Sequence, residues 1–243
     1  PIALDGADGW PLERYMAYYP FRQAGPEYVQ KLKTGEAKFS DAPGRAAAEW
    51  LAGLGRAGCF QEGFSSTGYA DAQAQFTSGK AAVYNIGTWE LGNLATDELD
   101  AGVRDSVDYF TLPTLPGAVT ADDEYVAPSG IGMAVNAATY DPLVRDFLAF
   151  ALERYPAEVA ASGALSPTTG VETEIPANAT PLYDRAITQA GEVGEKLAMP
   201  WDTQLDPATN TRLQQELTLL VQGDITPEEF TTTMDAALAE NLR

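Results

Sequence analysis

Hydrophobic positions along this chain recur mainly at helical spacing. Leu12, Met16 and Tyr19 follow Pro11 at intervals of three or four residues, which places their side chains on one face of a helix. A proline in the first turn of a helix costs no hydrogen bond, because the N–H groups of that turn have no partner inside the helix. Similar combinations recur along the chain and predict helices that begin near residues 11, 41, 142, 181, 207 and 227, and a shorter helix over 69–78.

The last of these helices carries the most complete start signal. Thr226 is followed three residues later by Glu229, a pair that forms a capping box when the two side chains and backbone N–H groups bond reciprocally. Phe230, Met234 and Leu238 then follow at intervals of four residues. This pattern predicts an amphipathic helix that packs one apolar face against the core.

Short runs with β character lie between the helices. They are Ala81–Asn85, Val107–Leu112 and Ile131–Asn136, and the first four residues, Pro1–Leu4, read as a strand entered midway. Helices that alternate with short apolar strands are typical of sheets covered by helices. The sequence therefore predicts an α/β fold.

Composition excludes several classes of function. The 243 residues contain 15 Lys and Arg against 35 Asp and Glu, a formal net charge of −20, so the basic clusters that bind nucleic acid or anionic membranes are not expected. Histidine is absent from the sequence, which excludes a Ser-His-Asp triad and His-ligated metals. The single cysteine, Cys59, excludes an intramolecular disulfide and a Cys-rich zinc site. We expect no cofactor.

Three motifs suggest ligands but fail on context. Residues 53–58 match G-x-G-x-x-G, yet they follow a predicted helix, whereas a dinucleotide site needs a strand before the glycines. Residues 5–9 resemble the start of a calcium loop without its spacing, and residues 122–124 are better explained as a solvated acidic loop. We expect no metal site. Among 35 acidic residues, a carboxylate pair at glycosidase distance has little weight as evidence of catalysis.

The tryptophans are more informative. Three of them lie at junctions between loops and elements, each within two residues of a carboxylate: Trp10 with Asp8, Trp89 with Glu90, and Trp201 with Asp202. The apolar C–H face of a sugar stacks on an indole, and its hydroxyl groups donate hydrogen bonds to carboxylates. Burial in the core remains an equal alternative for each ring, and it is the interpretation that we prefer for Trp50, which lies on the apolar face of its helix.

At three places the sequence resembles the extracellular solute-binding proteins of carbohydrate ABC importers, the family that includes maltose-binding protein. The residues PIALDGADGWPL at 1–12 are similar to the strand, glycine-rich turn and helix of that family. FTSGKAAVYNIGTWE at 76–90 resembles its helix stop and strand followed by G-[ST]-W, and LLVQGDITPEEF at 219–230 resembles its closing pair of helices.

The resemblance implies a periplasmic-binding-protein-like (type II) fold of two α/β lobes with a ligand cleft between them. Residues 1–128 and 177–243 are then expected in the carboxy-terminal lobe, and residues 129–176 in the amino-terminal lobe. The resemblance also implies that the chain crosses between the lobes near residues 128–130 and 170–176. We expect the sequence to be the later part of a longer protein, with much of the amino-terminal lobe missing.

The resemblance also implies a function without catalysis. A carbohydrate would lie between the lobes, contacted by Asp8, Trp10, Trp89, Glu90, Trp201 and Asp202, and would be delivered to an ABC transporter permease in the membrane. The expected location is extracellular, as a cell-surface lipoprotein or a periplasmic protein, and the full-length protein is expected to be a monomer. A glycan-processing enzyme with paired carboxylates and a protein-interaction module are the alternatives.

Overall fold

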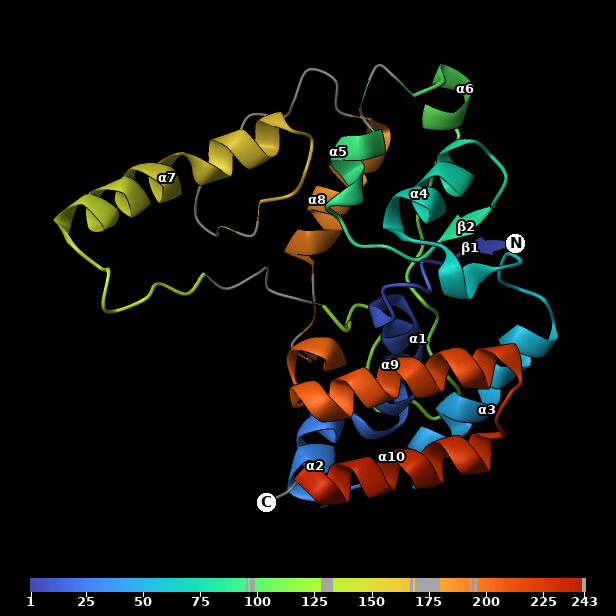
Figure 1. The fold of residues 1–243 in the computed structure, drawn as a ribbon. Helices are drawn as coiled ribbons and strands as arrows, with labels where there is room; N and C mark the ends of the chain where they lie inside the picture. The colour runs from blue at the N-terminus through green and yellow to red at the C-terminus, as the bar shows by residue number, and fades with distance from the viewer. Residues whose placement is uncertain are drawn as a thin grey trace. The chain divides into compact units, whose positions relative to one another are not determined.

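The computed structural model describes residues 1–94, 96, 99–127, 133–166, 168, 180–192, 194 and 196–241 (Figure 1). In chain order the elements are β1 (Ile2–Ala3), α1 (Trp10–Ala24), α2 (Tyr28–Thr34), α3 (Ala42–Arg56), η1 (Phe64–Ser66), α4 (Tyr69–Thr77), β2 (Val83–Tyr84), α5 (Glu90–Leu94), α6 (Ala101–Arg104), α7 (Pro142–Ala161), α8 (Pro181–Gly191), η2 (Trp201–Thr203), α9 (Pro207–Gln222) and α10 (Pro227–Asn241).

The predicted helices are confirmed at or close to the positions of their start signals. Asp206 accepts hydrogen bonds from the backbone N–H groups of Ala208 and Thr209 and so caps α9. The capping box of α10 forms in both directions: the Thr226 N–H donates to Glu229, and the Glu229 N–H donates to the Thr226 hydroxyl. These bonds satisfy N–H groups that have no partner inside the helix.

Four helices form the main hydrophobic core. α1 packs on α3, α3 on α9, and α9 on α10. The fully buried side chains follow the periodicity of the sequence and include Leu12 and Met16 of α1, Leu51 of α3, Leu213 and Leu217 of α9, and Phe230 and Met234 of α10. This burial of one apolar face per helix stabilises the part of the chain that carries the 5–10 loop and η2.

The β structure of the described residues is smaller than predicted. β1 and β2 pair in parallel, with Ile2 opposite Val83 and Ala3 opposite Tyr84. The strand predicted over Val107–Leu112 is wrong, because this segment forms no strand pairing and Phe110 is exposed. Of the strand predicted over 131–136, residues 131–132 lie outside the described residues, and 133–136 form no strand. Local β propensity forms a strand only where a partner supplies the ladder hydrogen bonds.

The chain divides into two compact units. Unit 1 comprises Pro1–Asn85, Phe110–Pro128 and Val193–Arg243, and unit 2 comprises Ile86–Tyr109 and Ser129–Glu192. The predicted crossings near 128–130 and 170–176 lie largely outside the described residues. The assignment of the segments to two lobes therefore stays a prediction.

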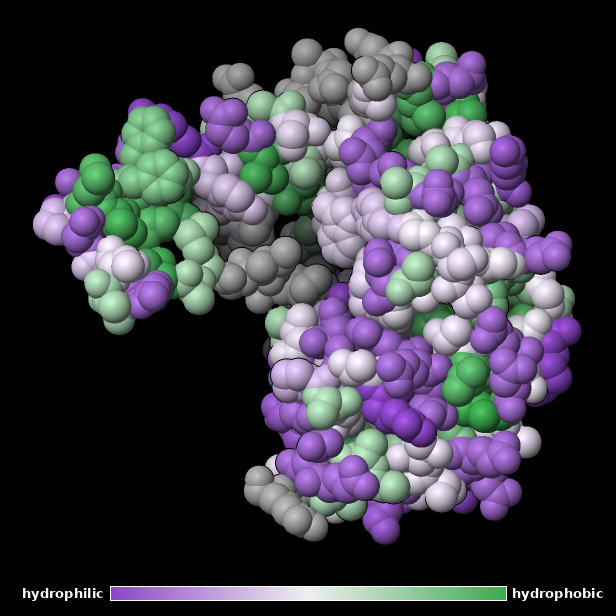
Figure 2. Space-filling model, in the orientation of Figure 1, coloured by the Kyte–Doolittle hydropathy of each residue, from purple (hydrophilic) through white to green (hydrophobic). Residues whose placement is uncertain are grey.

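Helix α7 of unit 2 exposes several large hydrophobic side chains. Leu143 is 76% exposed and Phe147 64%, and Phe150, Leu152 and Tyr155 are exposed as well. Figure 2 shows this concentration of hydrophobic residues in green over α7. Among the described elements, α7 carries the most exposed large hydrophobic side chains.

The G-x-G-x-x-G motif has a packing role. Gly55 lies in the last turn of α3, where a Cβ would come within 2.1 Å of the Val221 carbonyl oxygen of α9. Only glycine allows so close an approach of the two helices. The motif ends a helix, as the sequence predicts, and does not join a strand to a helix.

Candidate functional site

The loop over residues 5–9 leads directly into α1. The Gly6 and Ala7 N–H groups donate to the carbonyl oxygens of Phe64 and Thr67, which holds the loop against the segment after α3. Asp5 is buried, and burial together with a side-chain hydrogen bond to Asp8 raises its pKa to about 6. Asp8 is exposed and Trp10 is half-buried, so both predicted site residues reach the surface of unit 1.

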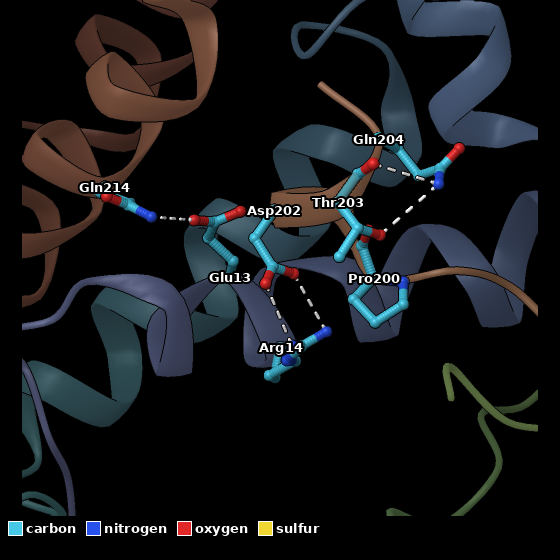
Figure 3. A network of polar contacts seen from close by, with 7 residues as sticks. All are labelled: Glu13, Arg14, Pro200, Asp202, Thr203, Gln204 and Gln214. Atoms are coloured by element: carbon cyan, nitrogen blue, oxygen red, sulfur yellow. Dashed lines mark hydrogen bonds and ion pairs between the residues drawn. The ribbon is translucent and has the colours of Figure 1, made fainter. Parts of the chain in front are cut away.

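Arg14 connects two of the predicted site residues. Its guanidinium carbon lies 5.3 Å from the centroid of the Trp10 ring. The same guanidinium holds the Asp202 carboxylate by two contacts, Nη1 to Oδ1 at 3.1 Å and Nη2 to Oδ2 at 3.2 Å (Figure 3). Trp10 of α1 and Asp202 of η2 are thus brought together through a residue that the sequence analysis did not single out.

Glu13 is the buried residue that precedes Arg14 in α1. Its side chain is 1% exposed, and its Oε1 accepts a hydrogen bond from the Gln214 amide of α9 at 2.8 Å (Figure 3). Burial raises the pKa of the Glu13 carboxyl to about 8, which the hydrogen bond from Gln214 opposes only in part. At neutral pH this carboxyl group is therefore largely protonated, and it does not add a second negative charge beside Asp202.

Trp201 occupies the core. Its ring is 3% exposed, lies nearly parallel to Tyr28 at a centroid distance of 6.2 Å, and meets Phe39 edge-on at 5.7 Å. An indole covered in this way offers no open face for a sugar in unit 1. Its contribution here is to anchor η2, which carries Asp202 next to it.

Trp89 and Glu90 belong to unit 2. The Trp89 side chain is 42% exposed and folds back over Gly87, where a Cβ would come within 2.0 Å of the indole. Glu90, at the start of α5, is only 2% exposed and accepts a hydrogen bond from the Asn93 amide at 3.2 Å. The indole is thus accessible while the neighbouring carboxylate is engaged within its own helix.

The predicted residues therefore differ in what they offer a ligand. Asp8, Trp10 and Trp89 have accessible side chains, whereas Trp201 and Glu90 are buried. Arg14 was not among the residues predicted from the sequence, although its position four residues after Trp10 places the two side chains on one helical face. Its link to Asp202 spans 188 residues and has no local signal.

Other features of the described residues do not compete with this site. A shallow hollow of unit 1 is lined by Gly55, Phe60, Gln61, Glu62, Gly63, Phe64, Ser65, Val221 and Gln222 and contains none of the predicted site residues. Within the described ranges, no three His, Cys, Asp or Glu side chains are grouped so that they could hold a metal ion. No described helix combines the length and apolarity needed to cross a membrane.

Comparison with known proteins identifies the family. The family described as bacterial extracellular solute-binding protein matches residues 1–154, more than half of the chain. The chain belongs to this family. No curated protein sequence matches this solute-binding protein.

Solved structures resemble the solute-binding protein along its length. A chitin oligosaccharide binding protein is 25% identical, covers 100% of the chain and has a TM-score of 0.83. A structure from work on xylan utilization by the thermophilic bacterium Caldanaerobius polysaccharolyticus is 20% identical over 97% of the chain, with a TM-score of 0.81. The bacterial solute receptor AcbH, described as exclusive for β-D-galactopyranose, is 14% identical over 100% of the chain, with a TM-score of 0.72.

These matches establish the fold as periplasmic-binding-protein-like, in agreement with the sequence prediction. The chain spans 60% of the length of the chitin oligosaccharide binding protein, 60% of the second structure and 61% of AcbH.

Proposed function

We propose that this protein binds a carbohydrate outside the cytoplasmic membrane and delivers it to an ABC transporter permease, without catalysing a reaction. The observation that carries the proposal is the similarity to a chitin oligosaccharide binding protein over the whole chain, at 25% identity and a TM-score of 0.83. Membership of the extracellular solute-binding family supports the same function and the same location.

The accessible aromatic side chains suit this role. Trp10 is half-buried at the start of α1, and Trp89 is 42% exposed ahead of α5. An indole that keeps one face accessible can stack on the C–H face of a pyranose and release poorly bound water. The exposed carboxylate of Asp8, two residues before Trp10, can accept hydrogen bonds from sugar hydroxyl groups.

Binding would be coupled to closure of a cleft. We propose that residues 1–128 and 177–243 form the carboxy-terminal lobe, that residues 129–176 belong to the amino-terminal lobe, and that the sugar contacts both. A ligand favours the closed state only through contacts that it makes better there than in the open state. The closed, loaded form would be the one that docks on the permease.

The proposal can be tested by titrating the protein with sugars and following tryptophan fluorescence. The panel is chitobiose, chitotriose, xylobiose, xylotriose and galactose, at concentrations from 1 μM to 10 mM, roughly the range over which weak to moderate binding is measured. A saturable change with at least one sugar is expected. No change with any sugar, together with saturable binding of a peptide or a metal ion, would contradict the proposal.

The same samples separate binding from hydrolysis. A glycan-processing enzyme with paired carboxylates would release new reducing ends from the oligosaccharides during prolonged incubation. A solute-binding protein leaves them intact, so we expect no increase above a control without protein. A steady increase that disappears when one carboxylate is replaced would favour the enzyme.

A further inference from the structure

The Trp10 indole makes a cation–π contact with Arg14 of the same helix, α1. Arg14 lies four residues after Trp10, one turn along α1, so the two side chains lie on the same helical face. The guanidinium carbon lies over the Trp10 ring at 5.3 Å from its centroid. A cation over an indole face is attracted by the electron density of the ring, which favours one orientation of both side chains.

Arg14 is itself fixed by Asp202. Arg14 Nη2 donates a hydrogen bond to Asp202 Oδ2 at 3.2 Å, and Nη1 lies 3.1 Å from Oδ1 as an ion pair without hydrogen-bond geometry. The planar guanidinium makes both contacts at once, which a lysine ammonium cannot do. The side chains of Arg14 and Asp202 are only 20% and 21% exposed, so water screens the pair less than it would on the surface. Trp201, 3% exposed in the core, anchors the segment that carries Asp202.

We propose that Arg14 is a positioning residue that, held by Asp202, fixes the orientation of the Trp10 indole for sugar stacking. The inference rests on the proposed function and extends it. It assigns Asp202 a role through Arg14 in place of the direct contact with sugar that the sequence suggests.

The neighbouring Glu13 is compatible with this role. Because its buried carboxyl group keeps its proton at neutral pH, it does not draw the guanidinium away from Asp202. The Gln214 amide of α9 donates a hydrogen bond to Oε1 of Glu13. Arg14 therefore has one ionised carboxylate in this network, and that carboxylate is Asp202 (Figure 3).

The test uses the full protein labelled with 5-fluorotryptophan, with the Trp10 fluorine resonance assigned from the Trp10→Phe variant. Arg14→Met and Asp202→Asn are expected to shift or broaden the Trp10 resonance and to leave those of Trp50 and Trp89 in place. Sugar affinity, measured with the best ligand of the panel above, is expected to fall about three- to tenfold in each variant. Arg14→Lys, which keeps the charge but not the two-contact geometry, should restore the affinity only in part.

A double-mutant cycle separates positioning from a general effect on stability. If Arg14 acts through Trp10, the affinity of Trp10→Phe combined with Arg14→Met should match that of Trp10→Phe alone. Arg212→Met removes an arginine that is ion-paired with Glu216 on α9 and serves as the matched control, with no expected change in the Trp10 resonance.

Two results would overturn the inference: an unchanged Trp10 resonance in Arg14→Met, or additive losses of affinity in the double variant. If Arg14→Met does not fold, Arg14→Lys and Asp202→Asn supply the same comparison. Failure of the proposed function is distinguishable, because the wild-type protein would then bind no sugar while the Trp10 resonance would still report whether Arg14 orients the ring.

Discussion

At the scale of single residues, the exposed indole of Trp89 makes a direct prediction. Its side chain is 42% exposed, so its removal costs little packing energy, whereas a stacked sugar would lose a large apolar contact. We expect Trp89→Ala to lower sugar affinity at least about fivefold and to change the free energy of unfolding by less than about 1 kcal/mol. Fluorescence titration and urea unfolding measure the two quantities.

Trp50 provides the matched comparison. It packs against the core and lies 5.1 to 6.0 Å from the rings of Tyr15, Tyr18 and Tyr19. Trp50→Ala should therefore lower the free energy of unfolding by about 2–4 kcal/mol through lost packing. If Trp89→Ala unfolds the protein to the same extent, Trp89 is a core residue and its proposed role is wrong.

Glu13 makes a prediction about pH. Its pKa in the folded protein is about 8, against an ordinary value of 4.5. Between these two values the folded protein keeps a proton that the unfolded chain releases, so stability must fall as pH rises. The slope approaches about 1.4 kcal/mol per pH unit for one whole proton. Urea unfolding from pH 5 to pH 9 measures it.

Glu13→Gln should remove this dependence and make the variant progressively more stable than the wild type as pH rises toward 8. Asp5, whose pKa is raised to about 6, still contributes below that pH, so the difference is clearest above pH 6. Glu228→Gln, at an exposed position of α10, is the control and should follow the wild type. Parallel curves for wild type and Glu13→Gln would show that the buried carboxyl does not set the slope.

The burial of single side chains could not be predicted from the sequence. The motifs singled out Trp10 and Trp201 on the same grounds, a ring at a loop junction beside a carboxylate, yet one is half-buried and the other is 3% exposed. Burial depends on residues far away in the sequence, such as Tyr28 and Phe39 for Trp201. For the same reason the pairing of Arg14 with Asp202 could not be predicted from the sequence.

At the scale of elements, helices were predictable because their signals are local. The caps at Asp206 and Thr226 bond to N–H groups two or three residues away, and the sequence contains both partners. Strands depend on partners elsewhere in the chain. Residues 2–3 pair with residues 83–84, 81 positions away in the sequence. Val107–Leu112, with similar composition, forms no strand.

The cap of α9 makes a prediction at this scale. Asp206 accepts hydrogen bonds from two backbone N–H groups, at 3.0 and 2.9 Å, and α9 packs against α1, α3 and α10. Asp206→Ala should lower the free energy of unfolding by about 1 kcal/mol, as measured by urea unfolding. Asp206→Asn keeps an acceptor and should recover most of the loss. Equal losses in both variants would indicate that the negative charge at the helix start matters more than the hydrogen bonds.

At the scale of the whole molecule, the apolar surface of α7 predicts self-association. Leu143 and Phe147 are 76% and 64% exposed, with Phe150 and Leu152 also exposed, and large apolar side chains gathered on one exposed helix promote association between molecules. We expect the 243-residue chain to bind a hydrophobic dye and to elute above its monomer mass in light-scattering chromatography at tens of micromolar, roughly the range of moderate association.

Replacing two of these residues tests the cause. Leu143→Glu with Phe147→Lys introduces a charge pair at helical spacing, which supports the helix while removing apolar surface. This variant should elute closer to the monomer and bind less dye. Thr211→Glu with Gln215→Lys places the same charges on exposed positions of α9 and should associate like the wild type. A wild-type chain that is monomeric and binds no dye would contradict the prediction.

Unit 1 is assembled from three separate stretches of chain, Pro1–Asn85, Phe110–Pro128 and Val193–Arg243. Leu12 and Leu51 of the first stretch share one core with Leu217 and Phe230 of the third. Backbone cleavage at a single point between the stretches should therefore leave the pieces joined under native conditions and separable only in denaturant. A premature stop codon before residue 193 would instead remove α9 and α10 and expose the apolar faces of α1 and α3 that pack against them.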